Sequence, residues 1–141
     1  MPKKVQWRLH CKSPPERLFK LLSTDAGRRL FWAEGSTSSQ SGFLLRFPDG
    51  TEECCLLVSA EPPHRFAFRY FGSEVEILLQ PDGSGGTDLT LTNIGVSDED
   101  YEEVNAGWLS VLLPLKAAAD FGVDLRNHDP RRTWRELYVD Q

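Results

Sequence analysis

One stretch of the sequence decides the fold: residues 98–121 read DEDYEEVNAGWLSVLLPLKAAADF. Acidic residues crowd its start, where a helix dipole favours negative charge, and Ser97 or Asp98 can cap it. Gly122 follows its end, as a helix-stopping glycine does. At about 1.5 Å per residue the predicted helix is about 30 Å long, enough to cross a small sheet. Its apolar side chains recur at steps of three and four and so share one face; they are Tyr101, Val104, Trp108, Val111, Leu112, Leu115 and Ala119.

Two residues depart from an ordinary helix pattern. Pro114 removes a backbone hydrogen bond and clashes with the preceding turn, so we expect a kink that wraps the helix around a curved surface. Gly107 allows a close approach beside Trp108. Packing of the helix on a sheet explains both residues, and shaping of a ligand cavity is a compatible alternative.

The segments before this helix read mostly as strands. Residues 4–11 alternate strictly between apolar and polar side chains, which predicts a half-buried strand. Two short helices are predicted next, at 14–23 with Ser13 as N-cap and at 24–31 with Thr24 or Asp25 as cap. Residues 36–42 are polar and indicate a flexible loop or a weak strand. About five further strands are predicted from alternation and turn signals, at 43–47, 51–60, 65–70, 74–79 and 87–94. Successive hairpins predict an antiparallel sheet with one buried face.

Length, charge and cysteine content exclude several classes of function. A length of 141 residues suits one domain, and the net charge of -5 with pI near 5.2 argues against a nucleic-acid surface. The N-terminus lacks the apolar core of a signal peptide, so we expect a cytoplasmic protein. An odd number of cysteines, Cys11, Cys54 and Cys55, indicates free thiols. We expect neither a metal site nor a cofactor.

Several motifs together resemble a known family. They are SPPERLFKLLS after the first strand, Phe31-Trp32, FPDG at 47–50, FRYF at 68–71, GGTDLTLT at 85–92 and GWLSVLLPLK at 107–116. This pattern resembles the START-like, or birch-pollen-allergen-like, helix-grip superfamily, and within it the branch named after activators of the heat-shock chaperone ATPase. The resemblance implies an α+β helix-grip fold, in which a curved antiparallel β-sheet wraps around a long C-terminal helix and two short helices follow the first strand. It also implies an apolar cavity under the long helix, but it leaves function open, because function depends on the site.

The expected cavity wall is mostly aromatic, as in small-molecule sites generally. Tyr70, Asn93, Trp108 and Cys55 can supply its few polar groups, and a filled core is the alternative reading. The candidate ligand-binding residues are Phe31, Trp32, Phe43, Leu45, Phe66, Phe68, Tyr70, Ile77, Leu91, Asn93, Trp108 and Leu112.

We expect no catalytic residues, because His10, His64 and His128 fall into no nucleophile motif. The leading hypothesis is a binding protein for a hydrophobic or amphipathic small molecule. The alternatives are a protein-interaction or co-chaperone-like module and, less favoured, an enzyme of the cyclase or hydrolase kind that uses the same cavity.

The predicted helix-grip domain covers residues 1–126, and residues 127–141 form a C-terminal tail. Asp129-Pro130 favours the start of a short helix to about Tyr138, and capping explains Asn127, His128 and Asp129. The helix would carry an apolar stripe of Trp134, Leu137 and Tyr138, which docks either on its own domain or on a second copy in a homodimer.

Overall fold

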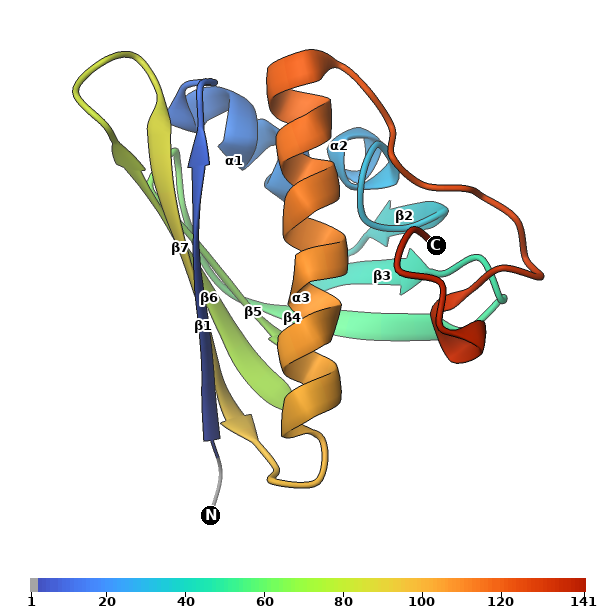
Figure 1. Cartoon of the computed structure of the whole chain (residues 1–141). Coiled ribbons are helices and arrows are strands. Elements are labelled where there is room, and N and C mark those ends of the chain that lie inside the picture. Colours follow the sequence, from blue (N-terminus) through green and yellow to red (C-terminus); the bar gives the residue numbers. More distant parts are fainter. Residues whose placement is uncertain (1–2) are drawn as a thin grey trace.

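The computed structural model describes residues 3–141 and shows one curved antiparallel sheet gripping a long helix (Figure 1). The seven strands lie in the order β1-β7-β6-β5-β4-β3-β2. The strands are β1 (Lys3–Cys11), β2 (Gly35–Ser38), β3 (Gly42–Arg46), β4 (Glu52–Glu61), β5 (Arg65–Tyr70), β6 (Ser73–Pro81) and β7 (Thr87–Val96). The helices are α1 (Pro15–Ser23), α2 (Asp25–Arg29) and α3 (Tyr101–Lys116), with single-turn elements η1 (Ala117–Phe121) and η2 (Trp134–Glu136). The expected α+β helix-grip fold is therefore confirmed.

The alternation seen in the sequence sets the two faces of the sheet. On β7, Leu89, Leu91 and Asn93 point inward and are buried, and their partners on β6 do the same, because opposite residues of a ladder share a face. β7 also pairs with β1, for example Trp7 with Leu91. The sheet thus presents one continuous apolar face to the helices.

The long helix begins later than predicted, and its last turn is π-helical rather than α-helical. It starts at Tyr101 rather than at Asp98, because the backbone N–H of Asp100 bonds to Ser97 in a turn before the helix. It passes through the buried Pro114 and widens into the π-helical turn η1. Gly122 then ends it in the left-handed conformation, φ 64°, as predicted.

Asp120 fastens the end of this helix to the β1–α1 corner. Its carboxylate accepts hydrogen bonds from the backbone N–H groups of Lys12 and Ser13, at 2.9 and 3.0 Å, and from the Ser13 hydroxyl at 2.7 Å. Ser13 also donates to the carbonyl of Ala119. The predicted role of Ser13 as an N-cap is therefore wrong, because Pro14 occupies the cap position of α1 and the hydroxyl of Ser13 is committed to the long helix.

Arg28 holds α2 against β2, the strand that the sequence indicated only weakly. Its buried guanidinium donates to Asp25, to Ser36 and to the carbonyl of Leu22, and it lies 4.0 Å from the ring centre of Phe43. The polar β2 is an edge strand with only Ser36 buried, so its sequence lacks an apolar alternation.

The tail differs from its predicted helix. The chain from Gly122 runs back across the molecule toward β3 (Figure 1), and its helical part is the single 3₁₀ turn Trp134–Glu136. Thr133 and Glu136 form a reciprocal capping box there, which favours a helix start at Trp134 over one at Pro130. Trp134 docks on α3: its indole N–H donates to Glu103. A β-carbon on Gly107 would lie 3.9 Å from the Trp134 ring.

Candidate functional site

An aromatic cluster centred on Trp32 fills the space between the sheet and α3. The ring centre of Trp32 lies 5.5 Å from that of Phe68, 5.6 Å from Tyr70, 6.1 Å from Phe43 and 6.2 Å from Trp108. Most of these rings are tilted or edge-on to one another, the arrangement that ring quadrupoles prefer. We call these five residues the Trp32 cluster.

Three regular elements and one connecting segment supply the Trp32 cluster. Phe43 points inward from β3, and Phe68 and Tyr70 point inward from alternate positions of β5. Trp108 comes from α3, on the face that alternation by three and four predicted. Trp32 is different, because it lies in the connection between α2 and β2 rather than on a regular element. Its position depends on how residues 30–34 are held.

Asn93 is a buried polar residue that contacts the cluster through Trp108. Its carbonyl oxygen accepts a 3.0 Å hydrogen bond from the indole N–H of Trp108, and its amide nitrogen donates to the Ser73 hydroxyl at 2.8 Å and to the Glu74 carbonyl at 3.0 Å. Because both ends of the amide are engaged, Asn93 fixes Trp108 to the sheet.

Two polar groups near α3 are held less firmly. The indole N–H of Trp32 reaches the hydroxyl of Tyr70 at 3.4 Å, at the long limit of a hydrogen bond. Burial raises the pKa of Tyr70, so its hydroxyl stays protonated. The hydroxyl oxygen of Ser110, one turn beyond Gly107, is the one buried side-chain N or O atom without a hydrogen-bond partner among residues 3–141. Buried polar groups are normally paired, so Ser110 is an exception.

The residues that the sequence proposed as ligand-binding all lie in this interior. All of them except Tyr70 and Asn93 belong to the buried hydrophobic cluster; Tyr70 packs against that cluster, and Asn93 is buried beside it. Cys55 is also buried, and burial raises the pKa of its thiol to about 12, which keeps it neutral. The predicted free thiols agree with the structure.

Two hollows in the surface lie elsewhere, against α1. One is lined by Phe19, Pro62 and Pro63 together with polar residues of α1, and the other lies between α1 and α2 beside Leu21 and Leu30. None of the predicted ligand-binding residues lines either hollow.

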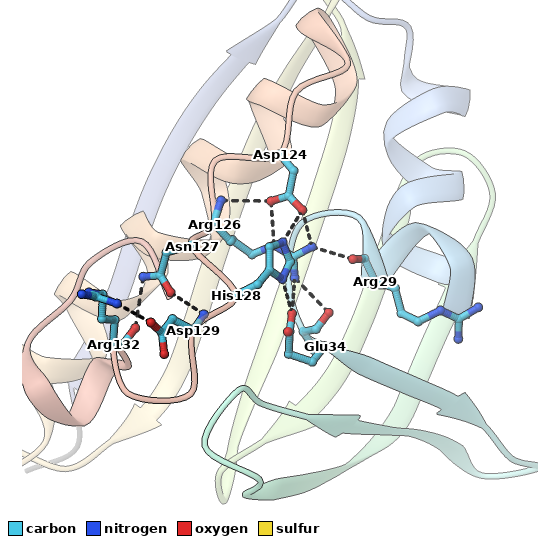
Figure 2. A network of polar contacts seen from close by, with 9 residues as sticks. Arg29, Glu34, Asp124, Arg126, Asn127, His128, Asp129 and Arg132 are labelled. Atoms are coloured by element: carbon cyan, nitrogen blue, oxygen red, sulfur yellow. Dashed lines mark hydrogen bonds and ion pairs between the residues drawn. The ribbon is translucent and has the colours of Figure 1, made fainter.

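A polar cluster formed by the tail was not foreseen (Figure 2). His128 lies between two carboxylates, with Nδ1 2.6 Å from Glu34 and Nε2 2.7 Å from Asp124. Arg126 is buried beneath it and bonds to the same Asp124. The sequence held only a weak signal, in that Asp124, Arg126 and His128 occur at alternate positions. The capping role that we expected for Asp129 is wrong, because the helical turn of the tail begins at Trp134 with Thr133 as its cap. Asn127 instead accepts from the N–H of Asp129 in a local turn.

The described part of the chain holds no group of three or more His, Cys, Asp or Glu side chains placed to bind a metal ion. Within residues 3–141, none of the helices is long and apolar enough to span a lipid bilayer.

Comparison with solved structures supports the fold. The Aha1 dimer of Colwellia psychrerythraea, solved in solution, matches with a TM-score of 0.75 at 20% identity and covers 85% of this chain and 98% of its own. Protein SSP2350 of Staphylococcus saprophyticus matches with a TM-score of 0.77 at 21% identity, covering 88% of this chain and 96% of its own. DynU16, described as a putative protein in the dynemicin biosynthetic locus, matches with a TM-score of 0.73 at 20% identity, over 86% of this chain and 48% of its own. Identities this low establish the fold alone.

Comparison with sequences says more about the family of this chain than the structural matches do. No curated protein sequence matches this chain significantly. The family model described as "Activator of Hsp90 ATPase homolog 1-like protein" matches residues 12–120, from the end of β1 to Asp120. That match covers most of the strands and α3, so the chain belongs to the family of Activator of Hsp90 ATPase homolog 1-like proteins.

Proposed function

We propose that the protein binds a hydrophobic or amphipathic small molecule between the sheet and α3, at the Trp32 cluster. The observation that carries this proposal is the position of Trp32: its ring lies next to the rings of Phe31 and of the four other cluster members, yet it is attached to a connecting segment. Rotation of that one side chain would leave an aromatic space that a planar apolar group fills. The loosely held Tyr70 hydroxyl supplies a polar contact for an amphipathic ligand.

Burial of apolar ligand surface at the Trp32 cluster allows weak binding. A ligand that buries about 200 Å² of apolar surface gains about 5 kcal/mol at about 25 cal/mol per Å². Displacing Trp32 and immobilising the ligand offset part of that gain. The net gain of less than about 5 kcal/mol corresponds to a dissociation constant weaker than about 0.2 mM.

Binding is favoured over catalysis because the interior offers no ready general base. Tyr70 belongs to the cluster and Cys55 lies opposite Phe43 on the neighbouring strand, and burial raises the pKa of both, so both remain neutral near pH 7. A cyclase or hydrolase needs a group poised to exchange a proton near that pH. The likeness to DynU16, found in a biosynthetic locus, concerns the fold and keeps the enzyme alternative open.

Ligand titration with two tryptophan variants tests the proposal. Wild type, Trp32→Ala and Trp7→Ala are titrated with fatty acids, sterols and planar aromatics, and the melting temperature is recorded. Trp7 packs on the other side of α3, where it donates to the carbonyl of Asn105, so Trp7→Ala controls for loss of an indole. We expect a saturable rise in wild type and in Trp7→Ala, and a larger rise in Trp32→Ala because its cavity is already open. No shift in the wild type with any compound would overturn the proposal.

A protein-interaction role is the second candidate. At the tail, Leu137 is 91% exposed and Val139 is 63% exposed, so two large apolar side chains lie in water close together in sequence. Of the stripe proposed for a homodimer, Trp134 docks on α3, whereas Leu137 and Tyr138 remain exposed. The similar Colwellia protein is a dimer.

The mass of the protein in solution tests whether it associates through the tail. Light scattering compares wild type with Leu137→Asp and with the control Leu56→Asp, which charges an exposed leucine of β4. A dimer lost only in Leu137→Asp supports association through the tail. A monomeric wild type at high concentration rejects it.

A further inference from the structure

The chain beyond α3 forms a strap across the outside of the domain. We use this name for residues 123–141, which follow the left-handed Gly122 and lie beyond the residues that match the family. The strap runs from the end of α3 past α2 and β2 to the vicinity of β3 (Figure 1). Its far part is closed on itself, because Asn127 N–H bonds to the Asp140 carbonyl at 2.8 Å and Trp134 N–H bonds to Gln141 at 2.7 Å.

Arg126 is the permanent anchor of the strap. Its guanidinium is almost fully buried and donates to the carbonyls of Ala33 at 2.9 Å and Arg29 at 2.6 Å. It also binds both carboxylate oxygens of Asp124 at 3.0 Å, a two-point contact that fixes its orientation. The strap is thereby tied to the connection that carries Trp32.

His128 adds a second tie, and its geometry specifies a charge state (Figure 2). Nδ1 lies 2.6 Å from Glu34 Oε2, and Nε2 lies 2.7 Å from Asp124 Oδ2. A neutral imidazole has one N–H, so one of its two nitrogens would direct a lone pair at a carboxylate. Only the doubly protonated ring donates to both. We infer that His128 is a proton-operated latch, which closes the strap onto Glu34 when the ring is charged and releases it when the ring loses a proton.

The charges around the ring favour its protonated form. From the α2–β2 connection Glu34 faces the ring, and from the strap itself Asp124 and Arg126 do; the Arg126 guanidinium lies 3.8 Å from Glu34. Asp129, next in sequence, is engaged by Arg131 and Arg132. Arg46 of β3 lies against Gly35, beside Glu34. The two carboxylates, the arginine and a charged His128 are together neutral, and loss of the proton leaves a net negative group.

The direction of the pH effect follows from these contacts. Partial burial opposes the charge on His128, but the hydrogen bonds that the ring donates to Asp124 and Glu34 outweigh it and raise its pKa above the ordinary value of about 6.5. A group whose pKa is raised on folding contributes its full stabilisation below the unfolded value and loses it as pH rises through the folded value. The latch is therefore closed in mildly acidic solution and opens on the alkaline side.

The latch acts on the segment that positions Trp32. Glu34 is two residues from Trp32, and its N–H is held by the Arg46 carbonyl of β3 at 2.9 Å. Release of Glu34 removes one of the contacts that keep residues 31–34 in place. If the Trp32 cluster takes a ligand, a consequence that rests on the proposed function, the open latch favours entry.

Hydrogen exchange of the full-length chain tests the latch without any ligand. Exchange of peptides covering 31–34 and 123–130 is measured from about pH 6 to about pH 9 and divided by the intrinsic rate at each pH. We expect normalised exchange to rise several-fold in the wild type as pH passes the raised pKa of His128. In Glu34→Gln the midpoint shifts to lower pH, because one carboxylate is gone. In His128→Asn, which tolerates the left-handed backbone at this position (φ 59°), exchange is already high at pH 6.

The exposed pair His10–Asp82 at the β6–β7 end provides the control. His10→Gln leaves the latch intact, so its profile matches that of the wild type. A flat wild-type profile, an unshifted midpoint in Glu34→Gln, or wild-type protection in His128→Asn at pH 6 would each overturn the inference. Because no ligand is present, these outcomes are independent of whether the Trp32 cluster binds one.

Discussion

Trp108 of the long helix and Asn93 of β7 form a 3.0 Å hydrogen bond in the interior of the domain. The bond fixes the rotation of the helix relative to the sheet, because Asn93 is itself held by Ser73 and by the Glu74 carbonyl. A polar side chain thus sets the geometry of an otherwise aromatic interior.

Asn93→Ala is expected to destabilise the protein by about 3 kcal/mol. The substitution leaves the indole N–H of Trp108 buried without an acceptor, which costs more than the net value of one hydrogen bond. Urea denaturation measures the effect. Thr92→Ala, one residue earlier and on the outer face, should stay within about 0.5 kcal/mol of the wild type. Equal losses in both variants would contradict a special role for Asn93.

Asp120→Asn is expected to cost about 2 kcal/mol near neutral pH and much less in acid. Burial opposes the charge of Asp120, but the bonds from Lys12 and Ser13 prevail and lower its pKa to about 2. A depressed pKa contributes stability above the unfolded value of about 3.9 and loses it as pH falls through the folded value. Unfolding free energies from pH 7 to pH 2 should therefore converge for the two proteins. Asp88→Asn on the outer face of β7 serves as control, and a difference that does not depend on pH would contradict the role of the carboxylate.

Arg28→Lys is expected to destabilise the domain by about 2 kcal/mol although the charge is kept. The planar guanidinium serves Asp25, Ser36 and the Leu22 carbonyl at once, and an ammonium group cannot reach all three. Arg8→Lys, on the exposed face of β1, should be neutral. A full wild-type melting temperature in Arg28→Lys would show that charge alone holds α2 to β2.

Replacing Gly42 and Gly107 by alanine should have opposite effects on the stability of the protein. At Gly42 the new β-carbon would lie 1.9 Å from the Cys55 carbonyl oxygen, so the β3–β4 ladder must shift and we expect a loss of about 3 kcal/mol or more. At Gly107 it would meet the Trp134 ring at 3.9 Å, an ordinary contact, and removing a helical glycine should gain about 0.5 to 1 kcal/mol. Thermal denaturation distinguishes the two. Destabilisation by Gly107→Ala would mean that α3 needs flexibility there.

The sequence predicted the regular elements well where one face is buried. Alternation located β5, β6 and β7, and the step of three and four located α3 with its stop at Gly122. It indicated β2 only weakly, because that polar edge strand is held by Arg28 rather than by apolar side chains. Its estimate of the helix start was three residues early, since acidic residues suit a turn before a helix as well as its first turn.

The interior and the strap were predicted less completely. Inward-facing residues follow from periodicity, so the cluster members on β3, β5 and α3 could be named, whereas Trp32 was named through the Phe31-Trp32 motif. How closely the rings approach depends on rotamers that no pattern specifies. The contact of His128 with Glu34 joins residues 94 positions apart in sequence. Only the folded chain brings them together, which is why capping was a sufficient explanation from local sequence.

Native mass spectrometry of freshly purified protein, followed by denaturing extraction, tests small-molecule binding most directly. We expect an additional non-covalent mass that Trp7→Ala retains and that Trp108→Ala loses, because Trp108 forms the helix side of the Trp32 cluster. Bare wild-type protein that also takes up no fatty acid, sterol or planar aromatic on incubation would contradict the proposed function.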